Sequence, residues 1–157
     1  MPYGVVWLAI IEFFTWDSKF VSSPQSLIMN TKPNSLLQGS LFTEFRTVSA
    51  MMAIHCRDHH SSDGLCADCQ SLLNYAETKL DRCPYGQDKP TCNRCPIHCY
   101  KPDPKEQMRQ VMRYAGPRML LPHPILAIRH LIHERKAVPE KPLPNRSNRH
   151  QRMSTNK

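Results

Sequence analysis

Seven cysteines, all within residues 56–99, constrain the fold of this chain more than any other feature. A hydrophobic share of 40% and a mean hydropathy of −0.52 predict a small apolar core. A domain with a small core gains stability from disulfides or from a bound metal. Two pairs have the Cys-x2-Cys spacing, which lets two thiolates bind one ion from a single tight turn. The order is Cys56-x9-Cys66-x2-Cys69-x13-Cys83-x8-Cys92-x2-Cys95-x3-Cys99.

The start of the sequence and the odd number of cysteines argue against a secreted, disulfide-bonded protein. Residues 1–4 carry no positive side chain, the apolar run from Val5 to Phe14 contains Glu12, and no cleavage site follows. That run is far shorter than the roughly 20 residues that cross a bilayer. We therefore expect a cytoplasmic protein without a membrane segment, in which thiols stay reduced and bind metal. Met1 and Met29 both remain candidate starts.

The apolar pattern predicts a helical hairpin with cysteines at its tip. The first helix should end near Cys56 and be followed by a polar turn. The second carries an apolar face from Leu65 to Leu80, with Ser62 or Asp63 as its N-cap. In the first helix the apolar residues fall at i, i+4, i+7 and i+11, namely Leu41, Phe45, Val48 and Met52.

Proline and glycine delimit two later helices. Asp103-Pro104 is typical of an N-cap followed by proline at the first helical position, and Gly116-Pro117 is typical of a helix end. A last helix should begin at His123-Pro124, with Ile125, Ile128 and Ile132 as its apolar residues.

The fold class that follows is all-α, a small helical domain organised around one or two Cys-rich metal sites. We place this domain at residues 41–136. Residues 1–40 show no sustained period and are expected to form a flexible extension. Residues 137–157 are rich in Pro, Asn and Arg and are expected to form a disordered basic tail.

The cysteines divide into two candidate metal sites, and the first lies at the hairpin. Cys56 ends one predicted helix, while Cys66 and Cys69 lie in the first turn of the next. A helix N-terminus lowers the thiol pKa and so favours the thiolate that a metal needs. His59 or His60, in the turn between the helices, would complete a Cys3His set suited to structural zinc.

The second candidate site consists of Cys83, Cys92, Cys95 and Cys99. Three closely spaced cysteines and a remote Cys-Pro are typical of cubane iron–sulfur ligation, although the triple here has x2-x3 spacing instead of x2-x2. Four thiolates would hold zinc equally well. The cofactor is therefore zinc or a [4Fe–4S] cluster, and spacing leaves both open.

Positive charge is concentrated after the cysteines. Residues 101–157 contain 13 Lys and Arg against 4 Asp and Glu, whereas residues 1–100 contain 8 against 9. This asymmetry is compatible with nucleic acid or an acidic protein partner, with Arg109, Arg113 and Arg118 as candidate contacts. No catalytic constellation and no site for a small-molecule substrate emerge, so we expect a protein that is not an enzyme.

Several segments resemble the bacterial nitrous oxide-stimulated promoter family. The resemblance extends from about Phe45 to His133. It implies a small intracellular Cys-rich protein associated with the response to nitrogen oxides, and it brings no established catalytic residues. The segments that carry it are 83–86, 89–92, 95–102, 111–119 and 123–127, together with Cys56-Arg57, His59-His60, Cys66 and Cys69.

The leading hypothesis is a cytosolic metal–thiolate protein, holding zinc or an iron–sulfur cluster, that acts in the bacterial response to nitrosative stress and nitric oxide. The alternative is a zinc-stabilised nucleic-acid-binding module that uses the basic C-terminal part. A redox enzyme built on Cys-x2-Cys is the weakest hypothesis, because no βαβ pattern surrounds either pair.

Overall fold

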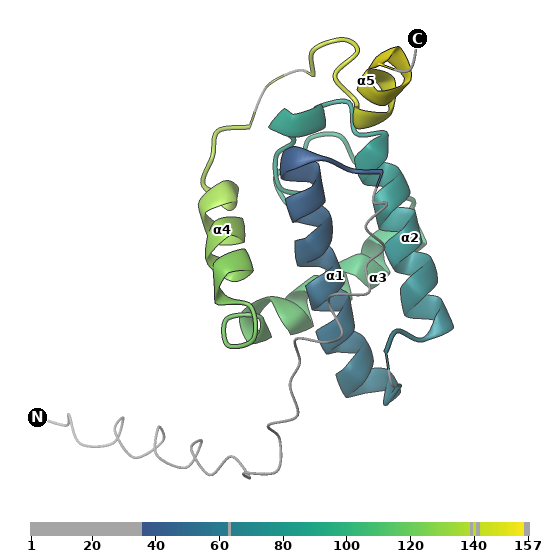
Figure 1. Ribbon diagram of the computed structural model, residues 1–157. Coiled ribbons are helices and arrows are strands. Elements are labelled where there is room, and N and C mark those ends of the chain that lie inside the picture. Colours follow the sequence, from purple (N-terminus) through teal and green to yellow (C-terminus); the bar gives the residue numbers. More distant parts are fainter. Residues whose placement is uncertain (1–35, 63, 139, 141, 156–157) are drawn as a thin grey trace, which may run out of the picture.

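The computed structural model describes residues 36–62, 64–138, 140 and 142–155, and every regular element in them is a helix (Figure 1). No strand occurs among these residues, which confirms the predicted all-α class. Expectations for residues 1–35, including the two candidate starts, lie outside the described part of the chain. The elements are α1 (Gly39–His60), α2 (Ala67–Asp81), the short 3-10 helix η3 (Gly86–Asp88), α3 (Pro102–Arg118), α4 (Pro124–Glu134) and α5 (Asn148–Thr155).

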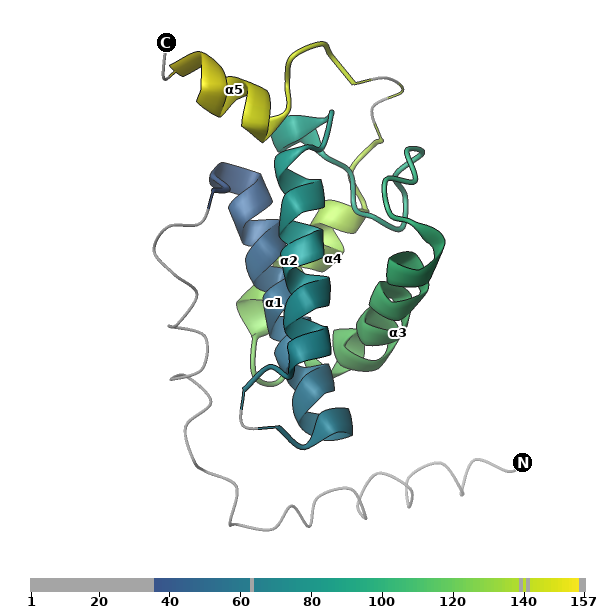
Figure 2. The ribbon, with the colours of Figure 1, turned by 90° about the vertical axis from the view of Figure 1, so that its right-hand side faces the viewer.

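Helix α1 is the centre of the fold. It packs against α2 to form the predicted hairpin, and it also contacts α3 and α4 (Figures 1 and 2). The apolar stripe predicted from the sequence forms the buried face of α1. The side chains that α1 buries in the core include Leu41, Phe45, Val48, Met52 and Cys56.

The helix boundaries differ from the predicted ones at the hairpin tip. Helix α1 continues one turn past Cys56 and ends at His60, and Ser61 then adopts a left-handed conformation with φ of 49°. The N-cap of α2 is Cys66, whose Sγ accepts the Cys69 N–H at 3.5 Å. The prediction of Ser62 or Asp63 as the cap is therefore wrong, because α2 begins only at Ala67, later than the sequence pattern indicated.

Helix α3 begins two residues earlier than predicted. Lys101 is its N-cap and Pro102 its first residue, so Lys101-Pro102 does what Asp103-Pro104 was predicted to do. Both pairs place proline where a missing N–H costs nothing. Pro117 lies within the last turn of α3 and does not end it.

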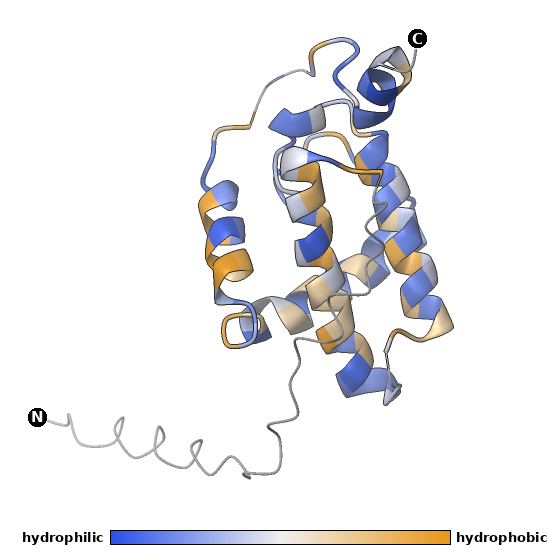
Figure 3. Cartoon of the chain, viewed as in Figure 1, coloured by the Kyte–Doolittle hydropathy of each residue, from blue (hydrophilic) through white to orange (hydrophobic). Residues whose placement is uncertain are grey.

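Helix α4 begins at Pro124 with His123 as N-cap, as predicted, but its isoleucines do not form a core face. Ala127 is buried, whereas Ile125 is 80% exposed. Figure 3 shows both hydrophobic and hydrophilic residues along this helix. Among the described residues no helix is long and apolar enough to cross a membrane.

The tail predicted to be disordered contains α5. Asn148 is buried, and its Nδ2 donates to Asp81 Oδ1 at 2.6 Å and to the Leu36 carbonyl at 2.8 Å. Arg152 pairs with Asp81 Oδ2 at 3.1 Å. The disorder prediction is thus wrong for α5, because contacts with α2 hold a segment that has no apolar stripe of its own.

Candidate metal sites

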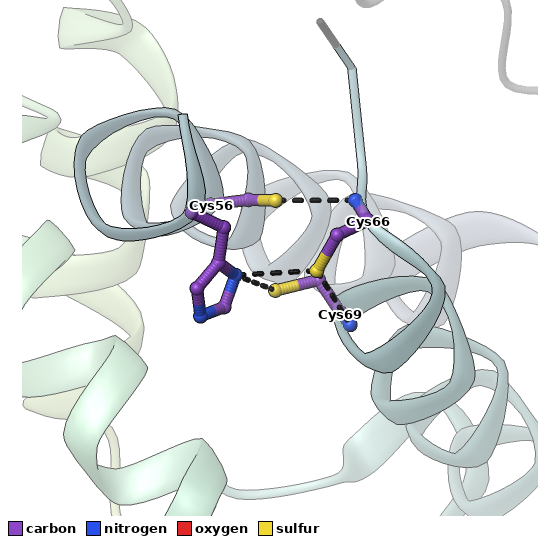
Figure 4. Close-up of side chains that lie close together, drawn as sticks. Cys56, Cys66 and Cys69 are labelled. Carbon is purple, nitrogen blue, oxygen red and sulfur yellow. Dashed lines mark hydrogen bonds between the residues drawn. The ribbon is translucent and has the colours of Figure 1, made fainter. Parts of the chain in front are cut away.

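The hairpin brings four predicted ligands together. The ligand atoms of Cys56, His60, Cys66 and Cys69 all lie within 4.8 Å of one another. Figure 4 shows the Cys66 and Cys69 thiols linked to the imidazole and the Cys56 thiol linked to the Cys66 backbone nitrogen. Cys56 and Cys69 are buried, Cys66 is half-buried and His60 is exposed. Four protein ligands in one group are what a structural zinc site needs.

Helix geometry explains this convergence. Cys56 and His60 are four residues apart at the end of α1 and therefore share one face. Cys66 and Cys69 are the N-cap and a first-turn residue of α2, so both thiols lie at the positive end of that helix. The left-handed Ser61 reverses the chain between the two pairs.

Hydrogen bonds hold the four side chains in place. The Cys66 backbone N–H donates to Cys56 Sγ at 3.2 Å. His60 Nδ1 lies 3.2 Å from Cys66 Sγ and 3.3 Å from Cys69 Sγ. Ser62 Oγ lies 3.1 Å from Cys56 Sγ and donates to the Gly64 carbonyl at 2.8 Å. A cation at the centre of this group would meet three sulfurs and one nitrogen.

The thiols differ in acidity. Burial raises the pKa of Cys56, but hydrogen bonding with the Cys66 N–H, with Ser62 and with the neighbouring thiols outweighs it and brings the pKa below the usual value. Burial, together with the neighbouring Cys66 and Cys56 thiols, raises the pKa of Cys69 to about 12. Packing this many sulfurs together favours the anionic form only when a cation is present. The donor set therefore fits a bound metal.

His59, the other histidine considered from the sequence, does not join this group. Its Nδ1 lies 3.0 Å from the His55 carbonyl oxygen. Its ring stacks on His55 at 4.2 Å and meets Tyr114 edge-on at 4.3 Å. Burial and the neighbouring His59 and His60 rings lower the pKa of His55. The structure thus places His60, and not His59, beside the three thiols.

The second predicted group lines one cavity. Cys83, Cys92, Cys95 and Cys99 all belong to the walls of a cavity of about 610 Å³ formed by α2, the loop after η3 and α3. Cys83 is buried, Cys95 is half-buried, and the other two are exposed. Although all four residues are described, no three of their sulfurs lie within 4.8 Å of one another. These four cysteines therefore line one cavity, but their sulfurs do not converge as closely as the ligand atoms at the hairpin do.

A buried lysine adjoins this cavity. Lys89 is 5% exposed, donates to the Pro90 carbonyl at 2.9 Å and lies 3.6 Å from Glu44 Oε2. Burial lowers the pKa of Lys89, but Cys92, Glu44 and Cys83 outweigh it and raise the pKa. Burial also raises the pKa of Cys83, against hydrogen bonding from the Tyr85 N–H. A fixed positive charge therefore lies beside the thiols.

The comparison with known families matches the part of the chain that contains both cysteine groups. The nitrous oxide-stimulated promoter family matches residues 39–143. The chain belongs to this family. It is 53% identical over 73 residues to "Uncharacterized protein YgbA" of Escherichia coli (strain K12), an alignment that covers 46% of the chain and 62% of that relative. The chain thus spans less than two thirds of the length of that protein. No solved structure matches this chain.

The nitrous oxide-stimulated promoter match includes all seven cysteines and His60, and it ends before α5. It therefore confirms the resemblance inferred from residues 45–133. One contributor to the hairpin site escaped the sequence analysis. The Cys66 N–H donor carried no sequence signal.

The basic side chains considered for partner binding lie on α3 of this family member and are exposed. Arg109 pairs with Glu106 at 2.9 Å. The Arg118 guanidinium lies 3.8 Å from the centre of the Tyr114 ring. Arg113 and Arg109 also line the cavity of the second cysteine group, whereas Arg118 lies toward the hairpin.

Proposed function

We propose that the protein is a metal–thiolate protein of the bacterial cytoplasm that acts in the response to nitrosative stress, and that Cys56, His60, Cys66 and Cys69 bind one zinc ion. The observation that carries the proposal is the convergence of these four ligand atoms within 4.8 Å. Tetrahedral zinc with Zn–S bonds of about 2.3 Å places its ligands roughly 4 Å apart.

The donor set favours zinc over harder ions. Three thiolates and one imidazole are soft or intermediate ligands, whereas magnesium and calcium require oxygen. The four protein ligands fill a tetrahedral shell and leave no position for substrate, which supports a structural role for this metal.

The link to nitrogen oxides comes from the family. Its description names a promoter stimulated by nitrous oxide, which associates its members with cells exposed to nitrogen oxides. Metal-bound thiolates react with nitric oxide, so a chain with seven cysteines in 157 residues suits such a response chemically. The proposed role is to maintain growth during this stress.

Anaerobic purification with metal analysis tests the site. The full-length chain should carry one hairpin zinc, and His60→Ala should weaken zinc binding by at least about tenfold. His59→Ala is the matched control, because His59 lies on the same turn but outside the group, and it should leave zinc affinity unchanged. Equal losses in both variants, or a wild-type protein without zinc, would refute this assignment.

Growth measurements test the role in the cell. A strain lacking the gene should recover more slowly from a nitric oxide donor than its parent. The wild-type chain and His59→Ala should restore recovery, while Cys66→Ser should not. Unimpaired recovery of the deletion strain would contradict the stress function without touching the zinc assignment.

A second candidate function is a nucleic-acid-binding module stabilised by the same zinc. The observation that favours it is the excess of 13 basic over 4 acidic residues in 101–157, which includes the exposed Arg109, Arg113 and Arg118. Such a module should bind duplex DNA with an affinity that falls steeply with salt. Retention of a DNA fragment at low but not at high salt would support this role, and no retention at low salt would exclude it.

A further inference from the structure

The second cysteine group lines a cavity that is larger than a single ion needs. We infer that Cys83, Cys92, Cys95 and Cys99 hold a [4Fe–4S] cluster in the cavity between α2, the loop after η3 and α3. This inference goes beyond the proposed function and does not depend on zinc at the hairpin. It rests on the sulfur positions, the size of the cavity and the charge of its walls.

The spacing of the sulfurs separates the two kinds of centre. Around one zinc ion the sulfurs lie about 4 Å apart, and the hairpin ligands already meet this condition. In a cubane cluster each thiolate binds a different iron, so the four sulfurs stand farther apart than around one ion. The cavity cysteines surround a common space, yet no three of these described sulfurs lie within 4.8 Å of one another.

The volume of the cavity also favours a group larger than one ion. A single ion needs about the space of one water molecule, roughly 30 Å³, whereas this cavity holds about 610 Å³. Leu80, Tyr85 and Met108 contribute apolar wall next to the cysteines, and all three are buried. Apolar walls limit solvent access, which tunes and protects an iron–sulfur cluster.

The charge of the walls complements a cluster. A [4Fe–4S] core with four thiolates is an anion. Among the described lining residues Glu134 is acidic, against five basic side chains. Lys89 is buried and pairs with Glu44 at 3.6 Å, and a cluster in the cavity would give this buried charge a second anionic partner. The basic residues are Lys79, Lys89, Lys105, Arg109 and Arg113.

The loop that carries three of the cysteines is tied to other elements. Arg94 donates to the carbonyl of Glu134 at 2.6 Å and to that of Lys136 at 3.0 Å. At its other end the Lys101 N–H donates to the Tyr75 hydroxyl at 3.0 Å. Figure 2 shows this loop leading into the N-terminal end of α3. The loop is therefore fixed on both sides of Cys95 and Cys99, and these two cysteines and Cys92 all line the cavity.

Anaerobic purification of the full-length chain, followed by iron, sulfide and zinc analysis, tests the inference. We expect about four irons and four sulfides per chain, besides the hairpin zinc, and a broad visible absorption that bleaches on reduction. Mössbauer spectra of the wild-type protein should report a cubane. Two zinc ions without iron, or only two irons per chain, would overturn the cluster.

Variants locate the cluster. Cys92→Ser and Cys95→Ser should each lose most of the iron and the visible absorption while keeping hairpin zinc, which shows that they remain folded. His98→Ala is the matched control, because His98 lines the same cavity from the same loop, and it should retain iron. Full iron content in Cys92→Ser and Cys95→Ser would refute these ligands. Iron lost only together with the hairpin zinc would place it at the other site.

Discussion

The two cysteine groups lie on different kinds of backbone. At the hairpin every ligand belongs to a helix or to a helix cap, and hydrogen bonds with Cys66 fix two of the sulfurs. In the cavity, Cys83, Cys92, Cys95 and Cys99 lie between α2 and α3, outside regular helices. Helices place ligands at the separation that one ion needs, whereas an irregular loop can surround a larger group.

The comparison assigns different tasks to the two regions. The hairpin site joins α1 to α2 and includes Cys56 and Cys69, which are 0% and 4% exposed and belong to the apolar core. Its metal should therefore contribute to folding. Cys92 and Cys99 are exposed, so a group in the cavity is open to small molecules such as nitric oxide. We expect stability to depend on the first site and reactivity on the second.

The largest effect should come from Cys66→Ser at the hairpin. Serine is one of the best N-caps, so this change keeps or improves the cap of α2 while it removes a zinc ligand. Since structural zinc contributes about 10–16 kcal/mol of binding free energy, its loss should lower the free energy of unfolding by several kcal/mol. Chemical denaturation followed by circular dichroism measures the change.

Cys92→Ser provides the comparison for that experiment. Cys92 is exposed and lies on a loop, so its replacement should change the free energy of unfolding of the protein core by about 1 kcal/mol or less. If Cys66→Ser is as stable as the wild type, the cap explains this position and the hairpin metal is not structural. If Cys92→Ser unfolds the chain, the division of tasks is reversed.

Most of the helices could be predicted because their signals are local. The stripe from Leu41 to Met52 and the pair His123-Pro124 report periodicity and proline geometry, which depend on neighbouring residues alone. α5 could not be predicted in this way. It has no apolar stripe, and it is held by Asn148 and Arg152, which contact Asp81 far away in the sequence.

The candidate sites could be predicted in composition but not in detail. Spacing placed Cys56, Cys66 and Cys69 together, and the structure agrees. The choice of His60 over His59 depended on how far α1 continues, because only a helix that extends to His60 brings it onto the face of Cys56. The separation of the sulfurs in the second group depends on the tertiary packing of a loop. Cys-x2-Cys spacing does not encode that packing.

The two sites should also differ in how fast they react with nitric oxide. We expect the visible absorption and the iron of the cavity site to disappear roughly tenfold faster than the hairpin zinc, because a buried site must open before it reacts. An anaerobic titration with a nitric oxide donor, with iron and zinc release measured together, follows both. Earlier release of zinc would assign the sensitive site to the hairpin. Release of both at one rate would contradict the division into two regions.

A smaller effect should come from the contact between α5 and α2. Asn148→Ala removes a hydrogen bond to the buried Asp81, two residues before Cys83, and should cost about 1–2 kcal/mol of unfolding free energy. Hydrogen exchange should rise at the end of α2 and not at the hairpin tip. Ser154→Ala, on the exposed side of α5, is the control and should change little. If the end of α2 is equally protected from hydrogen exchange in both variants, α5 does not stabilise the end of α2 that leads to Cys83.

The smallest effects on stability are expected from replacing one arginine at the cavity and one near the hairpin. Arg113 lines the cavity and is exposed, so Arg113→Ala should change the free energy of unfolding by less than about 0.5 kcal/mol. Arg118→Ala also loses the contact with the Tyr114 ring near the hairpin and should cost about 0.5–1 kcal/mol. These near-neutral variants make a clean test of nucleic-acid binding.

If α3 presents one surface to DNA, each of these two changes should weaken binding and reduce the salt slope by about one. If the basic side chains instead belong to their own regions, Arg113→Ala should affect only the cavity, seen as a changed reduction potential of its cluster, and Arg118→Ala should affect neither DNA nor cluster. Salt-dependent binding to a duplex, measured beside the potential, decides between a shared surface and two separate regions. A loss of DNA affinity in both variants without any change in potential would favour the nucleic-acid module.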